Sequence, residues 1–206
     1  LADEAFLDAK TAVRIPPDMS LEVALAMHEN YWDVHHAVST CGKVGAKDTF
    51  LVLGASGACG MAAMDLGKAF GARIAACAST PEKLAACQAC GADYVIDYES
   101  GGSEGFLAAL KQADLYGKVT VIFDPVGGSY AEAAFRAMAP EGRYVVFGFA
   151  AGGTDPKSAF PKFPMNLLLM KGQQIIGSMG TSRGKSIADM FAMVKDGKLK
   201  PAVASR

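Results

Sequence analysis

The chain has 206 residues, of which 51% are hydrophobic and 20% are charged, and its formal net charge at pH 7 is −1. This composition supplies enough apolar side chains for one sizeable buried core, and no run of Lys and Arg indicates nucleic acid as a partner. The apolar runs are shorter than the ~20 residues that cross a bilayer, so no transmembrane segment is expected.

The first part of the chain does not share the pattern of the remainder. Residues 1–16 look like the end of another unit and run into a Pro-Pro pair at 16 and 17. From Ser20 to about Thr40, helical spacing of apolar residues predicts a helix that leads into the first strand.

Six short apolar runs then alternate with helical patterns. The runs are TFLVLG (49–54), RIAACA (73–78), DYVI (93–96), VTVIFD (119–124), RYVVFG (143–148) and QIIGS (174–178). The helical patterns occupy 58–71, 81–90, 103–115 and 129–138, and one more helix is expected at 184–197. Apolar runs without alternation are typical of parallel strands covered on both faces, and the helices between them form right-handed crossovers. We therefore predict an α/β fold with a doubly wound, mostly parallel six-stranded sheet, the Rossmann fold, in the strand order 3-2-1-4-5-6.

The turn after the first strand is rich in glycine. In LVLGASGACG (51–60), Gly54, Gly57 and Gly60 lie between that strand and its helix. Free backbone N–H groups and the positive end of the helix favour an anion there. A side chain at Gly57 would hold a pyrophosphate away, whereas Gly60 lets the helix pack closely. A tight turn without a ligand is the alternative, but the position on the first of six alternating strands favours dinucleotide binding.

The end of the second strand distinguishes NADP from NAD. NAD sites carry an Asp or Glu there, but this chain has Cys-Ala-Ser-Thr at 77–80. The hydroxyls of Ser79 and Thr80, with Lys83 one helical turn later, are suited to an additional 2′-phosphate. We therefore predict NADPH (NADP) as the cofactor. One of the two hydroxyl residues is also expected to cap the helix that opens at Pro81, which does not exclude phosphate contact.

Five cysteines, at 41, 59, 77, 87 and 90, make an odd number. They favour reduced thiols and an intracellular, reducing compartment, either the cytoplasm or an organelle matrix or stroma. Cys87 and Cys90 have metal-like spacing, but zinc requires two further ligands. We interpret them as helix residues, with a redox pair as the alternative, and we predict no metal site.

Seven stretches together resemble a known family. They are IPPDMS, VLGASGACG, ASTPEKL, GADYVIDY, VIFDPVGG, GRYVVFGFAAG and NLLLMKGQQIIGS, in family order and spacing from about residue 13 to 200. The chain resembles the nucleotide-binding part of a quinone oxidoreductase-like member of the medium-chain dehydrogenase/reductase family. The resemblance implies three parts: 1–40, the remnant of an amino-terminal catalytic domain with a connecting helix; 41–182, the dinucleotide-binding domain; and 183–206, a truncated carboxyl-terminal segment.

The resemblance also implies which residues contact the cofactor, all of them in turns beyond the carboxyl ends of strands. They are Gly57, Ala58 and Cys59 along the pyrophosphate; Ser79, Lys83 and Tyr98 at the 2′-phosphate and adenosine end; Phe147, Gly148 and Phe149 along the nicotinamide; and Ser178 and Met179 on its other side. Residues 124–128 would form the turn beneath the cofactor. Tyr98 could instead be an ordinary residue after the third strand, and Phe147 an ordinary core residue.

Members of this branch transfer hydride from NADPH to a quinone or a conjugated enone without catalytic zinc, and homodimers through the sixth strand are common. The resemblance assigns no catalytic side chain, because the cofactor carries the chemistry. A quinone or enone, a second copy of the chain, or a larger complex are therefore the expected partners.

Two departures from the family argue against turnover by this chain. Relative to the family, the amino-terminal domain is expected to be missing except for residues 1–16, and the usual Tyr-Gly-Thr stretch is replaced around Trp32 and Asp33. Trp32 would restrict the nicotinamide, and Asp33 would place a carboxylate near the cofactor. The adjacent His35 and His36 point in different directions on a helix, and we expect structural roles for them.

Three functions remain open from the sequence. The first is an NADPH-dependent quinone or enone oxidoreductase. The second is an accessory subunit of a respiratory or photosynthetic assembly that kept the fold and lost turnover, and the third is an NADPH-sensing module.

Overall fold

The structure is a computed structural model that describes residues 6, 12–179 and 186–201. Six strands form one sheet in the order β3-β2-β1-β4-β5-β6, and every neighbouring pair is parallel. They are β1 (Thr49–Val52), β2 (Arg73–Ala78), β3 (Tyr94–Asp97), β4 (Val119–Asp124), β5 (Met138–Val146) and β6 (Gln174–Gly177). The predicted fold and strand order are confirmed.

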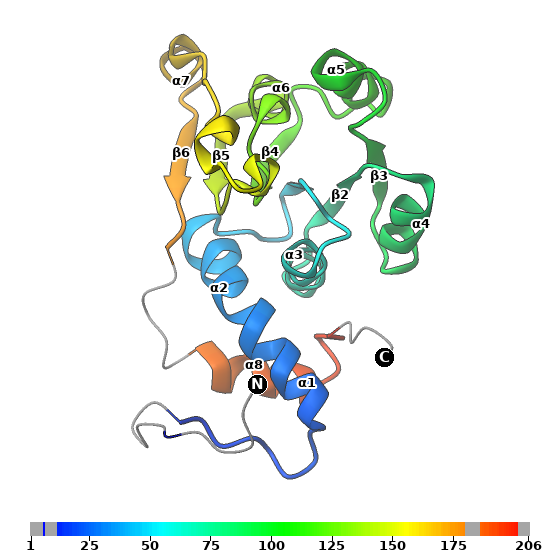
Figure 1. The fold of residues 1–206 in the computed structure, drawn as a ribbon, viewed down its shortest axis with the longest axis vertical. Coiled ribbons are helices and arrows are strands. Elements are labelled where there is room, and N and C mark those ends of the chain that lie inside the picture. The colour runs from blue at the N-terminus through cyan, green and yellow to red at the C-terminus, as the bar shows by residue number, and fades with distance from the viewer. Residues whose placement is uncertain (1–5, 7–11, 180–185, 202–206) are drawn as a thin grey trace.

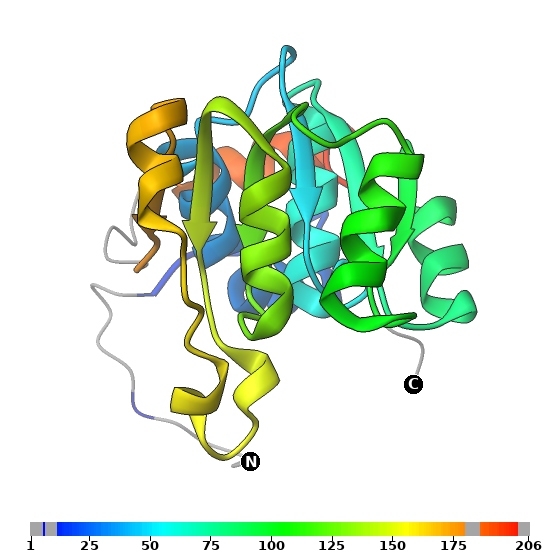
Figure 2. The same ribbon diagram turned by 90° about the horizontal axis from the view of Figure 1, so that it is seen from above.

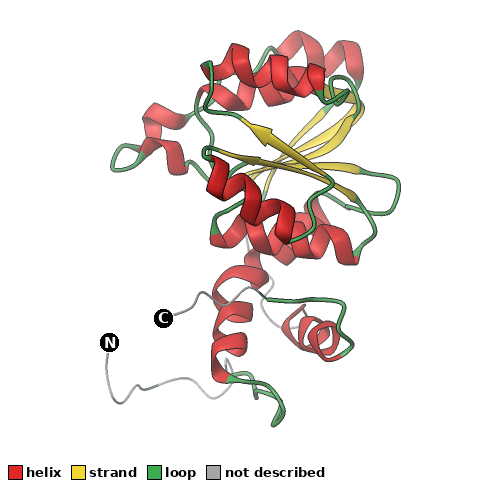
Figure 3. Cartoon of the chain, turned by 90° about the vertical axis from the view of Figure 1, so that its right-hand side faces the viewer, coloured by secondary structure: helices red, strands yellow, loops and turns green. Residues whose placement is uncertain are grey.

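Helices cover both faces of this sheet (Figure 3). On one face lie α3 (Ala58–Ala69) and α4 (Pro81–Ala89); on the other lie α5 (Gly102–Gln112), α6 (Ser129–Ala137) and α7 (Met165–Lys171), which stand side by side in Figure 2. The four helices predicted between the strands are present, and their bounds lie within about three residues of the expected ones. Two short 3₁₀ turns, Ala150–Gly152 and Pro156–Ala159, follow β5.

The burial of β1 on both faces explains why its sequence shows no alternation of apolar and polar residues. Phe50 and Val52 lie in the core cluster that also contains α3 residues, whereas Leu51 and Leu53 lie in the cluster with α5 and α6 residues. Successive side chains of a strand point to opposite faces, and here both faces are buried. An uninterrupted apolar run is the result.

A long helical stretch precedes β1 and packs with the last helix (Figure 1). It consists of α1 (Leu21–Ala26), α2 (Trp32–His35) and two π-helical segments, Met27–Tyr31 and His36–Cys41. Ser20 caps its start by accepting the N–H of Val23 at 3.3 Å. Helix α8 (Ser186–Lys195) contributes Ile187, Met190 and Phe191 to the same core cluster as Met27, Tyr31 and Val34. The helices predicted near 20–40 and 184–197 are therefore present in the described part of the chain.

Two predicted strands differ from the structure by more than one residue. The first strand ends at Val52 rather than 54, because Gly54 already has a left-handed backbone with φ of 59°. The fifth strand spans Met138–Val146 rather than 143–148, since Met138 already pairs with Val119 before a bulge interrupts the register. Phe147 and Gly148 therefore lie in the turn beyond the strand.

Candidate cofactor-binding site

The glycine turn after β1 is closed by its own backbone. The N–H of Gly57 donates to the carbonyl of Gly54 at 3.0 Å, and the N–H of Ala55 donates to the carbonyl of Cys77 at 2.9 Å. A Cβ atom on Gly60 would lie 2.3 Å from the Gly54 oxygen, so only glycine fits there. Gly54 has a φ that favours glycine. The fold itself therefore requires Gly54 and Gly60.

Gly57 has no comparable structural requirement. Its φ is −78°, and a Cβ there would approach only the Gly54 oxygen, at 3.3 Å. Gly57 and Ala58 are exposed, and Gly57 offers no side-chain cap to α3. The N–H groups of 58–60, in the first turn of α3, have no acceptor inside the helix. The turn thus presents a bare backbone and three N–H groups, which suit an anion.

Cys59 stands at this helix start and faces an acidic neighbour. Its thiol pKa is raised, first by burial and second by the carboxylate of Asp33. Asp33, an exposed residue of α2, is therefore close to the start of α3, where the pyrophosphate was predicted. The sequence predicted only a carboxylate near the cofactor, because its place beside the start of α3 depends on the packing of α2 against α3.

The turn after β4 is organised by a buried carboxylate. Asp124 accepts the backbone N–H groups of Val126 and Gly127, both at 2.8 Å, and the hydroxyl of Tyr144. Burial raises the pKa of Asp124, and these three hydrogen bonds oppose the rise. A Cβ on Gly54 would lie 2.9 Å from a methyl of Val126, so the turns after β1 and β4 touch. The predicted turn at 124–128 is confirmed.

The predicted adenosine-end residues lie together. The ammonium of Lys83 donates to the Ser79 hydroxyl at 3.1 Å, and Thr80 caps α4 by accepting the N–H of Lys83 at 3.3 Å. Tyr98 is half-buried, and its pKa is raised by burial and by the nearby carboxylate of Glu99, while a hydrogen-bonding interaction with the Ser79 side chain lowers it. The structure therefore brings Ser79, Lys83 and Tyr98 to one place, and the predicted helix cap is confirmed.

Two carboxylates near this cluster were missed. The second strand ends without an acid, but Asp97 ends β3 and Glu99 lies two residues later. After burial, the carboxylates of Glu99 and then Asp97 raise the pKa of Tyr130. The Asp97 carboxylate accepts the N–H groups of Glu99 and Ser100 and the Ser100 hydroxyl, which lower its pKa. These donors partly satisfy its charge. The parallel pairing of β2 with β3 sets Asp97 opposite Ala78, and so brings both carboxylates near Ser79. This pairing is the feature from which they could have been predicted.

Two of the three residues predicted along the nicotinamide, Phe147 and Gly148, pack onto β4 and the turn after it. Phe147 donates its N–H to the Asp124 carbonyl at 2.8 Å, and its ring lies 4.8 Å from that of Phe123. A Cβ on Gly148 would be 3.2 Å from the Pro125 carbonyl oxygen. The ring of Phe149 packs against Phe160 instead, with 4.8 Å between centroids.

Beyond β6, Ser178 donates its N–H to the Val146 carbonyl at 2.9 Å, and Met179 is 79% exposed. The hydroxyl oxygen of Ser178 is buried and has no hydrogen-bond partner among the described residues. A buried polar group without a partner is uncommon, and a ligand group would satisfy it.

Comparison with known proteins identifies the family. Residues 58–196 match the family model described as zinc-binding dehydrogenase. Quinone oxidoreductase-like protein 2 of Mus musculus is 32% identical over 194 residues, which cover 94% of this chain and 52% of that protein. The chain belongs to the medium-chain dehydrogenase/reductase family. It is similar to the quinone oxidoreductase-like branch in particular.

Solved structures of this family share the fold. The quinone oxidoreductase of Thermus thermophilus, described with its NADPH complex, has a TM-score of 0.72 and 25% identity over 93% of this chain and 60% of its own. AibC has a TM-score of 0.79 and 27% identity over 91% of this chain and 49% of its own. This medium-chain dehydrogenase/reductase chain thus spans about half the length of the curated relatives it matches.

The family description raises the question of zinc. Among the described residues, no three or more His, Cys, Asp and Glu side chains gather where they could hold a metal ion. The described residues therefore offer no ligand set that fits zinc. Cys87 is buried, whereas Cys90 is exposed at the end of α4, and both are free thiols.

The helices of the described chain include none that is long and apolar enough to cross a membrane.

His35, one of the two adjacent histidines, is half-buried, and burial lowers its pKa. Its Nδ1 lies 3.4 Å from the hydroxyl of Ser39, one turn later in the same helical stretch.

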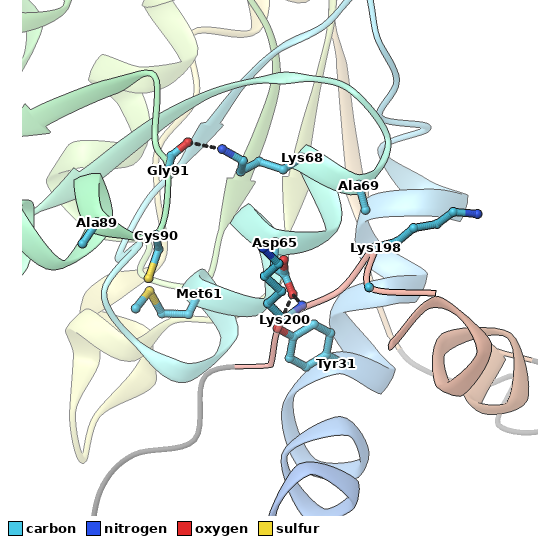
Figure 4. Close-up of a pocket in the computed structure, with 11 residues that line it drawn as sticks. Tyr31, Met61, Asp65, Lys68, Ala69, Ala89, Cys90, Gly91, Lys198 and Lys200 are labelled. Atoms are coloured by element: carbon cyan, nitrogen blue, oxygen red, sulfur yellow. Dashed lines mark hydrogen bonds between the residues drawn. The ribbon is translucent and has the colours of Figure 1, made fainter. Parts of the chain in front are cut away.

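A pocket of about 610 Å³ lies beside α3 (Figure 4). None of the predicted cofactor residues lines it. Within it, Asp65 accepts the Tyr31 hydroxyl at 2.7 Å and the Lys200 N–H at 2.8 Å, and burial, followed by Asp65, raises the pKa of Tyr31. These hydrogen bonds connect the helical stretch before β1 and the segment after α8 to α3. The polar residues of the pocket therefore have a structural role.

Proposed function

We propose that this chain binds NADPH and forms the nucleotide-binding part of an NADPH-dependent reductase of quinones or conjugated enones. The observation that carries the proposal is the convergence of Ser79, Lys83 and Tyr98 beside a glycine turn in which Gly57 is less constrained by the fold than Gly54 and Gly60. The NADPH complex of the Thermus thermophilus quinone oxidoreductase and the quinone oxidoreductase-like relatives support it.

Each part of the site would hold a different part of the cofactor. The N–H groups at Ala58 and Cys59, with the bare backbone of Gly57, would bind the pyrophosphate. Ser79, Lys83 and Tyr98 would bind the 2′-phosphate, because a charged donor and hydroxyls are complementary to it.

The nicotinamide would lie against the turns after β4, β5 and β6. Residues 147–149 would support one side of the ring, and Ser178 and Met179 the other. When bound, the cofactor supplies a hydride; the chain's own residues orient it and exclude water from one face. We assign no catalytic side chain, and we propose the hydride acceptor only as a class of compound, quinones or conjugated enones.

A specific observation favours a second candidate, an NADPH-binding module without turnover, as in a sensor or an accessory subunit. The Asp33 carboxylate stands near Cys59 at the helix start, and the ring of Trp32 packs edge-on against His28 at 5.2 Å and against the core cluster. Both side chains replace the small residues of the family pattern.

The test is a fluorescence titration of the chain with NADPH and NADH, followed by measurement of NADPH oxidation with a small benzoquinone. Tight binding of NADPH with weaker binding of NADH supports the proposed cofactor. Absence of binding for both would refute it. Oxidation by the wild-type chain or by the Trp32→Gly/Asp33→Thr variant would favour the reductase, and oxidation by neither would favour the second candidate.

A further inference from the structure

Three aromatic rings meet beside the predicted 2′-phosphate residues. Tyr98 follows β3, Phe106 lies in α5, and Tyr130 lies in the first turn of α6. The centroids of Tyr98 and Tyr130 are 4.8 Å apart with planes inclined by 56°, and Phe106 stands edge-on to both, at 6.3 Å and 6.2 Å. We call these three residues the aromatic cluster. Its contacts join α5 and α6, which are neighbours in Figure 1.

The cluster restrains Tyr98 from two sides. Phe106 is fully buried and forms the inner wall, whereas Tyr130 is only partly buried and forms the outer wall. The backbone N–H of Tyr98 donates to the Ala78 carbonyl at 3.3 Å, which fixes the residue beside Ser79. Rings packed in this way lose rotamer freedom, and tilted or edge-on pairs are favourable beyond their buried area.

We propose that Tyr130 is a positioning residue that holds the ring of Tyr98 with its hydroxyl toward Ser79 and Lys83, and thereby sets the preference of this chain for a 2′-phosphate. The inference rests on the proposed function. It adds a residue from α6, beyond the turn after β4, that neither the glycine turn nor the second strand indicates.

The charges around the cluster explain why this positioning matters. Lys83 is the cation proposed for the 2′-phosphate subsite, and Ser79 and Tyr98 add hydroxyl donors beside it. Glu99 lies close enough to act on both Tyr98 and Tyr130. A 2′-phosphate bound near this acid needs its donors in place, because a like charge disfavours binding. A Tyr98 ring free to rotate would supply its donor only part of the time.

The experiment compares Tyr130→Leu with Tyr130→Phe and with the remote control Tyr116→Leu. Tyr116 lies before β4, is 44% exposed and carries the ammonium of Lys111 over its ring. The probes are 2′,5′-ADP and AMP, which differ only in the 2′-phosphate, measured by calorimetry on the full chain. Thermal unfolding of each variant shows that it is folded.

We expect Tyr130→Leu to weaken 2′,5′-ADP binding by about 10-fold, as a lost aromatic contact allows, with little change for AMP. Tyr130→Phe keeps the ring and should bind both probes like wild type, as should Tyr116→Leu. Unchanged 2′,5′-ADP binding by Tyr130→Leu, equal losses for both probes, or tighter binding would each overturn the inference while the proposed function stands. If the wild-type chain binds neither probe, the proposed function fails, and the inference fails with it.

Discussion

The ammonium nitrogen of Lys83 lies 3.1 Å from the hydroxyl oxygen of Ser79, across the junction of β2 and α4. Thr80 makes this possible, because its side chain caps the N–H of Lys83 and α4 begins at Pro81, two residues after Ser79. Ser79 lies in the turn just before this cap, and the side chain of Lys83 reaches back to it from the first turn of α4. A cation and a hydroxyl are held together at the carboxyl end of the second strand.

Replacement of Lys83 by alanine should weaken NADPH binding by about 10-fold and leave NADH nearly unchanged, because only the 2′-phosphate loses a charge-assisted contact. Titration of both cofactors by fluorescence measures the two effects. Lys111→Ala, at the exposed pair with Tyr116, is the matched control and should change neither. Equal losses for NADPH and NADH would show that Lys83 does not face the 2′-phosphate.

Gly57 and Gly60 should respond differently to substitution. Gly57→Val has an allowed backbone and should cost about 1 kcal/mol through poorer helix capping, yet abolish NADPH binding because its side chain fills the pyrophosphate space. Gly60→Ala should cost about 1–3 kcal/mol, because its Cβ would meet the Gly54 oxygen at 2.3 Å.

Calorimetry and urea unfolding separate these two effects. Wild-type affinity in Gly57→Val would mean that the turn is only structural.

Tyr144→Phe should destabilise the fold by about 1–3 kcal/mol, because it removes a donor from the buried Asp124 carboxylate. Burial raises the folded pKa of Asp124 above its unfolded value, so folding takes up a proton and this group lowers stability as the pH rises through its folded pKa. By donating a hydrogen bond to the charged carboxylate, the Tyr144 hydroxyl reduces this decrease in stability at higher pH.

The destabilisation by Tyr144→Phe should therefore be larger at neutral than at acid pH, as measured by urea unfolding. Phe135→Leu, which alters a ring packed 6.1 Å from that of Tyr144 without removing a donor, is the control and should show no such pH dependence. A pH-independent effect of Tyr144→Phe would mean that the hydroxyl does not stabilise the charged carboxylate.

Binding and turnover are expected to separate around Trp32 and Asp33. The 206-residue chain should bind NADPH but oxidise it with benzoquinone no faster than the non-enzymatic rate, because hydride transfer requires donor and acceptor at near-contact distance. The double variant Trp32→Gly/Asp33→Thr restores the small residues of the family pattern. It tests how much Trp32 and Asp33 contribute to the expected absence of quinone-dependent oxidation. Robust quinone-dependent oxidation by the wild-type chain would contradict the prediction and support the plain enzyme.

The order of the elements could be read from the sequence because it depends on local rules. Apolar runs such as 73–78 and 119–124 are buried on both faces, and right-handed crossovers leave few possible strand orders. The glycine turn and the hydroxyls at 79 and 80 are local in the same sense. Their spacing relative to a strand end was sufficient to predict where they lie.

Contacts between distant segments depended on tertiary packing. The Asp33 carboxylate acts on the Cys59 thiol because α2 packs on α3, the Glu99 carboxylate after β3 acts on Tyr98 and Tyr130, and Asp124 accepts the Tyr144 hydroxyl between β4 and β5. Periodicity reports whether a residue is buried, but not which partner it finds. The sequence therefore determined the fold and the location of the glycine turn, and only the three-dimensional packing decided which charges and rings surround it.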